Sequence, residues 1–368
     1  MTVGVLKEPQ GETRVSLLPE AVAQLAKKGH RILVEKDAGS LSAAADDDYI
    51  KAGAEIAAAD VIAAAADVIL AINPPAIPVA SGKILIGVYQ PLFQQSLMQQ
   101  WAANGLTVFS LDMLPRTTRA QTMDVLSSQA NISGYKAVIL AAYAYPRYFP
   151  MFMTAAGSIT PAKVLILGAG VAGLQAIATA RRLGAVVEVF DTRPAVKEEV
   201  MSLGARFVEV EGAADASKAG GYAVEQSAEY QQKQQQKIAE STAKADIIIT
   251  TAQIPGKKAP ILITEEMLRN MRNGSLIIDI AAATGGNTPF TKNNETVKFN
   301  GVTIIGNSNL PATMPSDASK LYGKNIMNFL QLITSKEAGV SLNWEDDLVK
   351  GSCITHEGSV VHERVRAN

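Results

Sequence analysis

The sequence predicts an α/β protein that is built on parallel sheets and divided into two domains. Short runs of β-branched and aliphatic residues alternate with longer helical patterns along most of the chain. This alternation is typical of right-handed strand–helix–strand units. A length of 368 residues exceeds what one ordinary hydrophobic core encloses, which favours two domains. The segment TAAGSITPAK (Thr154–Lys163) interrupts the pattern, which then restarts.

Each expected strand is a short apolar run bounded by polar or glycine-containing segments. In the first half the expected strands are Val3–Leu6, Arg31–Val34, Asp67–Leu70, Ile84–Val88 and Leu106–Phe109, and in the second half they are Lys163–Leu167, Val186–Phe190, Arg206–Val210, Asp246–Thr250, Ser275–Ile280 and Val302–Ile305.

Helical patterns fill the intervals between these strands, as at Pro19–Lys28 and Gln94–Ala103. A last helix at Ser319–Thr334 follows the final strand, and we expect it to return to the first half. The predicted layout is therefore an N-terminal αβ domain of residues 1–128, completed by residues 314–368. A second domain of residues 129–313 is inserted between these two segments.

Composition excludes several classes of protein. The net charge is −1 and no Lys/Arg-rich run is present, so a nucleic-acid-binding or anionic-membrane surface is not expected. Cys353 is the single cysteine, which excludes a disulfide framework and a cysteine-rich metal site, and we predict no metal site of another kind. The N-terminus lacks a signal-peptide pattern. The long apolar run Ala54–Ile72 is interrupted by Asp60 and Asp67, so it falls short of a membrane span. We expect a soluble, cytosolic protein.

A dinucleotide fingerprint stands in KVLILGAGVAGLQAIATARRLGAVVEVFD, where Gly168, Gly170 and Gly173 form G-x-G-x-x-G between an apolar strand and an Ala-rich helix. The first glycine permits a tight turn, the second lets a pyrophosphate approach the backbone, and the third permits close helix–strand packing. Asp191 follows at the end of the next strand, as the fingerprint requires. The alternative is a glycine turn with a purely structural role.

Asp191 also favours NAD over NADP. A carboxylate at this position accepts hydrogen bonds from the ribose hydroxyls and repels a 2′-phosphate. Arg193, two residues further on, is the opposing signal, because an arginine there can receive that phosphate.

The sequence shows no evident general acid or base for a dehydrogenase reaction. Its three histidines, His30, His356 and His362, lie near the chain ends and outside any motif; we interpret each as a surface residue. Most nicotinamide dehydrogenases move a proton as well as a hydride. The absence of a proton-transfer residue therefore fits a hydride passed directly between two nicotinamides.

Two polar segments carry alternative interpretations. Glu211–Lys244 contains GGY (Gly220–Tyr222) and a Gln-rich run, and it is either a solvated helix or an excursion with a mobile flap over a ligand. PRTTRAQTMD (Pro115–Asp124) concentrates hydrogen-bonding groups in an otherwise apolar chain. Taken alone, this stretch is typical of a helix start that Thr118 caps, with Arg/Asp pairs on its solvated face.

Several longer motifs together indicate a family. They are GETRVSLLPE, PRTTRAQTMDVLSSQANISGYKAV, MTAAGSITPAKVLILGAGVAGLQAIATARRLGA, FDTRPAVKEEV, AGGYA, TTAQIPGKKAPILIT and GGN. Over essentially the whole chain, these closely resemble the NAD(H)-binding component of proton-translocating nicotinamide nucleotide transhydrogenase. The resemblance implies two Rossmann-like domains with parallel sheets and a cofactor cleft between them, a homodimer, and a relationship to alanine dehydrogenase.

The residues separate these two relatives. Alanine dehydrogenases carry an arginine for the substrate carboxylate, which Arg14 matches. They also carry a lysine where this chain has Asn73, a histidine where it has Gln90, and an aspartate in the segment that here reads IAAATGGN (Ile280–Asn287). With three of these four residues absent, the machinery for oxidising an amine is missing. The loop at Ala283–Thr284 also departs from the acidic or amide residues expected in transhydrogenases.

The resemblance also assigns site residues. Arg116, Gln121 and Asp124 match the arginine, glutamine and aspartate that organise the nicotinamide and its ribose, so they are the expected catalytic set. Their task is orientation, because hydride transfer needs the reacting atoms at about 3–3.5 Å. Tyr222 matches the tyrosine of the family's mobile loop. The expected cofactor-binding residues are Ser127, Gly168, Gly170, Val171, Gly173, Asp191, Thr192, Arg193, Gly221 and Tyr222.

The partners follow from the same resemblance. This chain would bind NAD(H), while a β subunit binds NADP(H) and a small membrane α-type subunit takes part in proton translocation. The protein would be cytoplasmic and peripheral on the inner face of the cell membrane, through these partners only. Two alternatives remain: a dehydrogenase of the alanine dehydrogenase type, which would oxidise NADH with pyruvate and ammonia by itself, and a non-catalytic NAD-sensing module, which would exchange no hydride with an NADP-binding partner.

Overall fold

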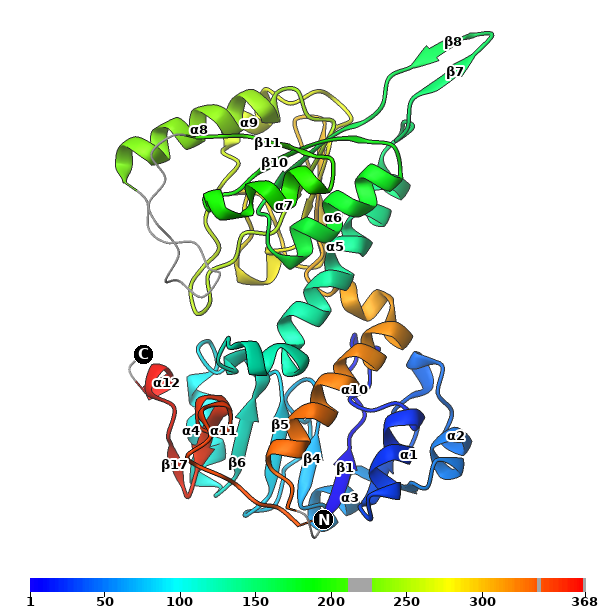
Figure 1. The fold of residues 1–368 in the computed structure, drawn as a ribbon, viewed down its shortest axis with the longest axis vertical. Helices are drawn as coiled ribbons and strands as arrows, with labels where there is room; N and C mark the ends of the chain where they lie inside the picture. Colours follow the sequence, from blue (N-terminus) through cyan, green and yellow to red (C-terminus); the bar gives the residue numbers. More distant parts are fainter. Residues whose placement is uncertain (211–226, 336–338, 367–368) are drawn as a thin grey trace. The chain divides into compact units, whose positions relative to one another are not determined.

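The computed structural model describes residues 1–210, 227–335 and 339–366 (Figure 1). The chain forms two compact units, one of Met1–Gln129 with Ala312–Asn368 and the other of Ala130–Pro311. Within these described ranges, no helix is both long enough and apolar enough to cross a membrane.

The first unit contains a doubly wound sheet whose strands run in the order β17-β16-β6-β5-β4-β1-β2-β3. Strands β1 to β6 are parallel, and β16 and β17 add an antiparallel edge. Read from β3, the parallel region has the order 3-2-1-4-5-6 of a Rossmann sheet. The strands are β1 (Thr2–Val5), β2 (Arg31–Glu35), β3 (Glu55–Ala57), β4 (Val68–Leu70), β5 (Ile84–Gly87), β6 (Thr107–Ser110), β16 (Cys353–His356) and β17 (Ser359–Val360).

Both faces of this sheet are buried, which explains why its strands are continuously apolar. Successive side chains point to opposite faces: Ile84 and Ile86 join one hydrophobic cluster, whereas Leu85 joins another. The crossover helices are α1 (Pro19–Lys27), α2 (Asp46–Lys51), α3 (Ala59–Ala65) and α4 (Gln95–Ala103).

Helix α10 (Pro315–Leu332) belongs to the first unit although it follows the second in sequence. Its apolar face buries Tyr322, Ile326 and Phe329 in the same cluster as β1, β2 and β4. Phe109 of β6 contacts Phe329 edge to face, with ring centroids 5.4 Å apart. The helix begins four residues before the predicted Ser319, because Pro315 has the fixed φ that suits a first helical residue. The short helices α11 (Asp347–Ser352) and α12 (Glu363–Arg366) follow.

The second unit repeats the topology, with the order β11-β10-β9-β12-β13-β15-β14. All pairings are parallel except that of β14 with β15. The strands are β9 (Lys163–Leu167), β10 (Val186–Phe190), β11 (Arg206–Phe207), β12 (Ile247–Thr250), β13 (Leu276–Asp279), β14 (Glu295–Phe299) and β15 (Val302–Gly306), and the helices are α5 (Val125–Ala144), α6 (Val171–Arg182), α7 (Lys197–Ser202), α8 (Ala228–Thr242) and α9 (Glu265–Arg269).

The predicted fold class is confirmed, since all eleven predicted strands are present. Only the strand predicted at Arg206–Val210 is much shorter. Val189 pairs with Phe207, so the residues after Phe207 run past the end of β10 and find little to pair with. The Gln-rich portion of Glu211–Lys244 forms α8, as the solvated-helix interpretation predicts, whereas residues 211–226 lie outside the described residues.

Several elements were not predicted. These are β3, β14, β16, β17 and a small hairpin of β7 (Phe152–Thr154) and β8 (Gly157–Ile159), which projects from the second unit in Figure 1. One interpretation was wrong, because His30 is only 7% exposed. It stands directly before β2, and burial lowers its pKa. His356 and His362 are half-buried.

Candidate functional site: a dinucleotide turn and a polar loop

The glycine fingerprint forms the turn between β9 and α6, and each glycine meets a different requirement. Gly168 has a φ of +106°, which a side chain would strain. A Cβ at Gly173 would lie 1.9 Å from the carbonyl oxygen of Gly168, so only glycine lets the helix pass this close to the strand. A Cβ at Gly170 would meet nothing within 4 Å. The space beside Gly170 is therefore open to a ligand.

The first turn of α6 offers backbone N–H groups at this open space. Gly170 is its N-cap and has no side chain to bond them, and Val171 is its first helical residue. Such a turn suits an anion, because the N–H groups and the helix dipole both favour negative charge. The residues present therefore fit the pyrophosphate of a dinucleotide.

Asp191 closes the turn from the neighbouring strand. Its Oδ2 accepts from the backbone N–H of Ala169 at 2.7 Å, which ties the end of β10 to the fingerprint. Arg193 forms a two-pronged ion pair with the same carboxylate, from Nε to Oδ1 at 2.8 Å and from Nη2 to Oδ2 at 2.7 Å. Thr192 lies between them, half-buried. The guanidinium that the sequence offered to a 2′-phosphate is therefore engaged by Asp191.

The loops that follow β12 and β13 are joined by Asn287. Its Nδ2 donates to the carbonyls of Ala252 at 2.9 Å and Pro260 at 2.8 Å, and its Oδ1 accepts from Ala252 N–H at 3.2 Å. Asp279 holds Asn287 in turn, accepting from its N–H at 2.6 Å. This gives a structural role to the GGN motif. In the loop at Ala283–Thr284, the Thr284 hydroxyl bonds to the carbonyl of Ala281 at 3.1 Å.

The polar stretch around Asp124 forms a 3₁₀ turn, Thr118–Met123, followed by α5. Asp124 lies 3.6 Å from the guanidinium of Arg116. Its carboxylate also accepts from the N–H of Ser127 at 2.9 Å and from the Ser127 hydroxyl at 2.6 Å. Gln121 is exposed. The structure therefore brings Arg116, Asp124 and Ser127 together and leaves the amide of Gln121 at the surface.

The alternative interpretation of this stretch was right in kind but wrong in residue. The helix that begins here is capped by Asp124, whose side chain accepts from the N–H three residues further on. Thr118 is not the cap; it is the first residue of the 3₁₀ turn, which has no side-chain cap. Because one carboxylate both caps α5 and pairs with Arg116, capping does not exclude a role in binding.

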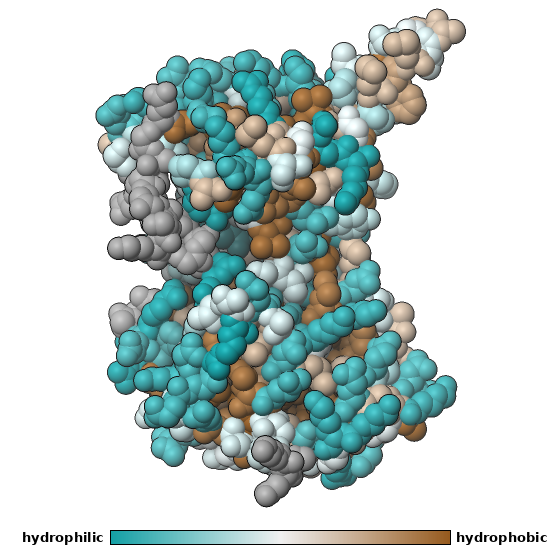
Figure 2. Space-filling view, in the orientation of Figure 1, coloured by the Kyte–Doolittle hydropathy of each residue, from teal (hydrophilic) through white to brown (hydrophobic). Residues whose placement is uncertain are grey.

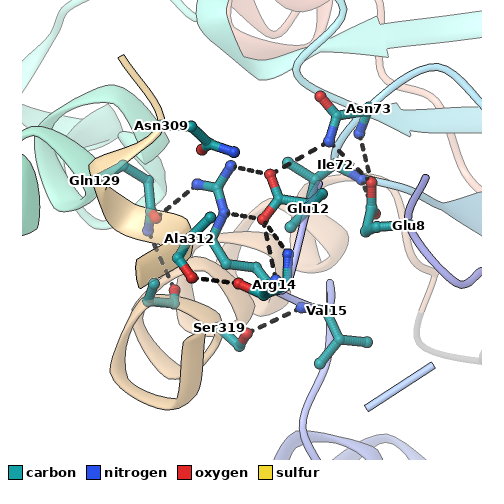
Figure 3. Close-up of polar contacts among 12 residues, drawn as sticks. Glu8, Glu12, Arg14, Val15, Ile72, Asn73, Gln129, Asn309, Ala312 and Ser319 are labelled. Atoms are coloured by element: carbon teal, nitrogen blue, oxygen red, sulfur yellow. Dashed lines mark hydrogen bonds and ion pairs between the residues drawn. The ribbon is translucent and has the colours of Figure 1, made fainter. Parts of the chain in front are cut away.

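A buried polar cluster that was not predicted from the sequence lies at the carboxyl ends of β1 and β4 (Figure 3). Arg14 and Glu12 form a two-pronged ion pair, with Nε to Oε1 at 2.8 Å and Nη2 to Oε2 at 2.6 Å, and Gln129 accepts from Arg14 at 2.9 Å. Glu8 accepts from Ile72 N–H at 2.6 Å and from Asn73 N–H at 3.0 Å. Two glutamates shortly after a buried strand are the sequence signal that could have found it.

The two glutamates of this cluster respond differently to burial. Burial raises the pKa of Glu8 to about 7, against the opposing hydrogen bonds from Asn73 and Ile72. Burial also acts to raise the pKa of Glu12. The hydrogen bonds and charge of Arg14 outweigh that effect, and the pKa of Glu12 lies below its ordinary value. The cluster therefore contains one fixed ion pair and one carboxyl group that titrates near neutral pH.

Glu8 should make the stability of the first unit fall as the pH rises. Its pKa is about 7 in the folded chain and ordinarily 4.5, so between these values the folded state binds more protons than the unfolded state. The free energy of unfolding therefore decreases by about 3 kcal/mol across this window on account of Glu8 alone.

We expect Glu8→Gln to remove this dependence. The measurement is urea unfolding at pH 5 and pH 8, followed by the fluorescence of Trp101 and Trp344, both in the first unit. The difference in unfolding free energy between wild type and variant should shrink or reverse by about 3 kcal/mol from the lower to the higher pH. Equal pH slopes would mean that Glu8 has an ordinary pKa.

Two predicted cofactor-binding residues, Gly221 and Tyr222, lie outside the described residues. Among the residues that the structure describes, no group of three or more His, Cys, Asp or Glu side chains is placed to hold a metal ion.

Known proteins resemble the chain over its whole length. Residues 4–133 match the family model "Alanine dehydrogenase/PNT, N-terminal domain", and residues 137–363 match "Alanine dehydrogenase/PNT, C-terminal domain". The chain is 43% identical to the first portion of NAD(P) transhydrogenase subunit alpha, a separate protein in Rickettsia prowazekii (strain Madrid E), covering 100% of this chain and 97% of that protein. Alanine dehydrogenase of Mycolicibacterium smegmatis (strain ATCC 700084 / mc(2)155) is 26% identical, covering 99% of this chain and 96% of that protein.

A solved structure agrees with this relationship. The crystal structure of transhydrogenase from Sinorhizobium meliloti superimposes with a TM-score of 0.89 at 45% identity, covering 98% of this chain and 100% of that chain. The chain thus belongs to the alanine dehydrogenase/PNT family and, within it, to the alpha subunits of NAD(P) transhydrogenase.

Proposed function

We propose that this chain is the NAD(H)-binding subunit of a proton-translocating transhydrogenase. When bound, NADH supplies a hydride that passes directly to NADP⁺ on a partner subunit, giving NAD⁺ and NADPH. Membrane partner subunits couple this exchange to proton translocation. The residues of this chain bind and orient the nucleotide and exchange no proton with it.

The state of Arg14 is the observation that carries this choice over amino-acid oxidation. Alanine dehydrogenases use the matching arginine for the substrate carboxylate. Here both prongs of the guanidinium are bonded to Glu12, and the Arg14 and Glu12 side chains are only 10% and 5% exposed. A substrate carboxylate would have to displace a buried carboxylate of the same protein. Asn73, where those enzymes have a lysine, is also bonded to Glu8, from Nδ2 to Oε2 at 3.1 Å.

The second unit supplies the nucleotide-binding turn in this proposal. Gly168, Gly170 and Gly173, with Val171 opening α6, hold the pyrophosphate. Asp191, flanked by Thr192, accepts from the adenosine ribose once the Nη2 of Arg193 releases Oδ2. The pairing of Arg193 with Asp191 supports NAD over NADP, because a 2′-phosphate would meet a neutralised guanidinium beside a carboxylate.

The polar loop supplies orientation. Arg116 and Ser127 hold the carboxylate of Asp124 between them, which leaves a defined acceptor for the nicotinamide ribose. The exposed amide of Gln121 can both donate and accept, so it fits the carboxamide and ribose side of a nicotinamide. Fixed positions for such groups suit a reaction whose barrier is set by geometry.

Partners and location follow from the same proposal. The relatives are named as alpha subunits of NAD(P) transhydrogenase, which implies a complex of several subunits. We assign NADP(H) to a β subunit and the membrane passage to that subunit and a small membrane α-type subunit. The chain would then be cytoplasmic and bound at the inner face of the cell membrane through these partners.

The β7–β8 hairpin supports the proposed homodimer. All of its strand residues are exposed, and Met153, at 77% exposed, is apolar. Figure 2 shows the hairpin coloured mostly white to brown where it projects from the second unit. An exposed apolar patch marks an interaction surface. Light scattering should give a dimer for the wild-type chain and a monomer for Met153→Lys. A wild-type monomer would refute the dimer, and a dimeric variant would exclude the hairpin from the interface.

Reconstitution tests the function. The chain is mixed with the NADP(H)-binding partner subunit, NADP⁺ and NADH carrying deuterium on the transferred position. Mass spectrometry should find the deuterium in NADPH with no label lost to water, since the hydride moves directly. No transfer would refute the proposal. Rapid oxidation of NADH by the chain alone with pyruvate and ammonia would identify an amino-acid dehydrogenase.

A further inference from the structure

The polar loop is held by a helix that contributes no residue to the proposed catalytic set. The carbonyl oxygen of Thr122 accepts from two side-chain amides of α10, from Asn325 Nδ2 at 2.8 Å and from Asn328 Nδ2 at 3.0 Å. Thr122 stands between Gln121 and Asp124. Its backbone is therefore fixed at the point where the loop presents its two acting side chains.

Asn325 also reaches the other side of Asp124. Its Oδ1 accepts from the hydroxyl of Ser128, in the first turn of α5, at 2.7 Å. One amide thus bridges Thr122 and Ser128, and Asp124 and Ser127 lie in the segment between these two points. Asn325 is only 7% exposed, and both halves of its amide are bonded. A buried amide without these partners would be costly, which explains why it fixes one geometry.

A second attachment comes from the start of α11. Arg119 donates to Asp346 at 2.9 and 2.5 Å and to Asp347 at 2.5 Å. Asp346 is itself the N-cap of α11, accepting from Leu348 N–H at 2.9 Å. These ion pairs are largely exposed, so they contribute little to stability. They nevertheless attach the turn that carries Gln121 to the C-terminal segment.

We propose that Asn325 is a positioning residue for hydride transfer, acting through the loop segment that it bridges, with Asn328 and Arg119 in support. This inference rests on the proposed function. Its physical basis is that small displacements of orienting groups slow a transfer reaction strongly, while they leave binding energy largely intact. Asn325 thus affects the rate without touching the nucleotide.

The test compares three variants in the reconstituted complex. Asn325→Ala removes both bonds, isosteric Asn325→Asp removes only the donor to Thr122, and Asn328→Ala removes the second, exposed donor. We expect kcat to fall by about tenfold for Asn325→Ala, somewhat less for Asn325→Asp and least for Asn328→Ala. The Kd for NADH of the isolated chain should stay within about twofold. If Asn325→Ala does not fold, Asn325→Asp provides the same comparison.

Two readouts separate positioning from a structural effect. Amide hydrogen exchange at residues 116–127 of the isolated chain should accelerate in Asn325→Ala, and this measurement needs no partner. In the background of Gln121→Ala, the effect of Asn325→Ala on kcat should largely disappear, because both act at one step. Unchanged kcat per folded chain, unchanged exchange, or multiplicative effects of the two substitutions would each overturn the inference. Absence of transfer in the wild type would instead refute the proposed function.

Discussion

Replacing Gly173 by alanine is expected to destabilise the second unit severely. The new Cβ would lie 1.9 Å from the carbonyl oxygen of Gly168 and 3.6 Å from Ile166, so α6 would have to move away from β9. Overpacking against backbone costs about 3 kcal/mol or more. We expect a lower melting temperature by circular dichroism and loss of NADH binding with it.

Gly170→Ala is the matched control for this experiment. The same added methyl group meets nothing within 4 Å at Gly170, and the φ of −77° suits alanine. The melting temperature should therefore stay unchanged. NADH affinity should still fall by about 10- to 100-fold, equivalent to about 1.4–3 kcal/mol, because the methyl group occupies the space of the pyrophosphate. Unchanged affinity in a stable Gly170→Ala protein would place the nucleotide elsewhere.

Replacing Gln121 by alanine is expected to slow hydride transfer by about a hundredfold or more, while the Kd for NADH changes little. Gln121 is an exposed residue of the 3₁₀ turn, so its removal should not disturb the core. The measurement is single-turnover transfer to NADP⁺ in the reconstituted complex, beside direct titration of the chain with NADH.

Thr118→Ala serves as the control, because Thr118 is an exposed residue of the same turn and has no assigned role. It should transfer hydride at the wild-type rate. A large loss of NADH affinity in Gln121→Ala with unchanged single-turnover transfer would contradict the orienting role and make Gln121 a simple binding residue.

The fold was predictable because its signals are local. Runs such as Ile84–Val88 are apolar on both faces of the sheet, and such runs between helical patterns indicate a parallel sheet. The antiparallel edges escaped prediction for a physical reason. β14, with the sequence ETVKF, is largely exposed and carries polar residues, so its pairing with β15 depends on the neighbouring strand rather than on its own composition.

The site was predictable where one segment contains its own chemistry. The glycine fingerprint and Asp191 lie within one strand–helix–strand unit, so their spacing describes their geometry. Asn325 could not be found this way, because its partners Thr122 and Ser128 are about two hundred residues away in sequence. An asparagine on the apolar face of a helix, beside Tyr322, Ile326 and Phe329, is the one local sign of a buried polar contact.

The shared strand order of the two sheets has a consequence for stoichiometry. Both sheets reverse direction at the same place, between the first and fourth strands, where α/β proteins receive their ligands. In the second unit, this point presents glycine N–H groups. In the first unit, it presents the carboxylates of Glu8 and Glu12, which would repel a phosphate. A chain with two such sheets should therefore bind one dinucleotide, not two.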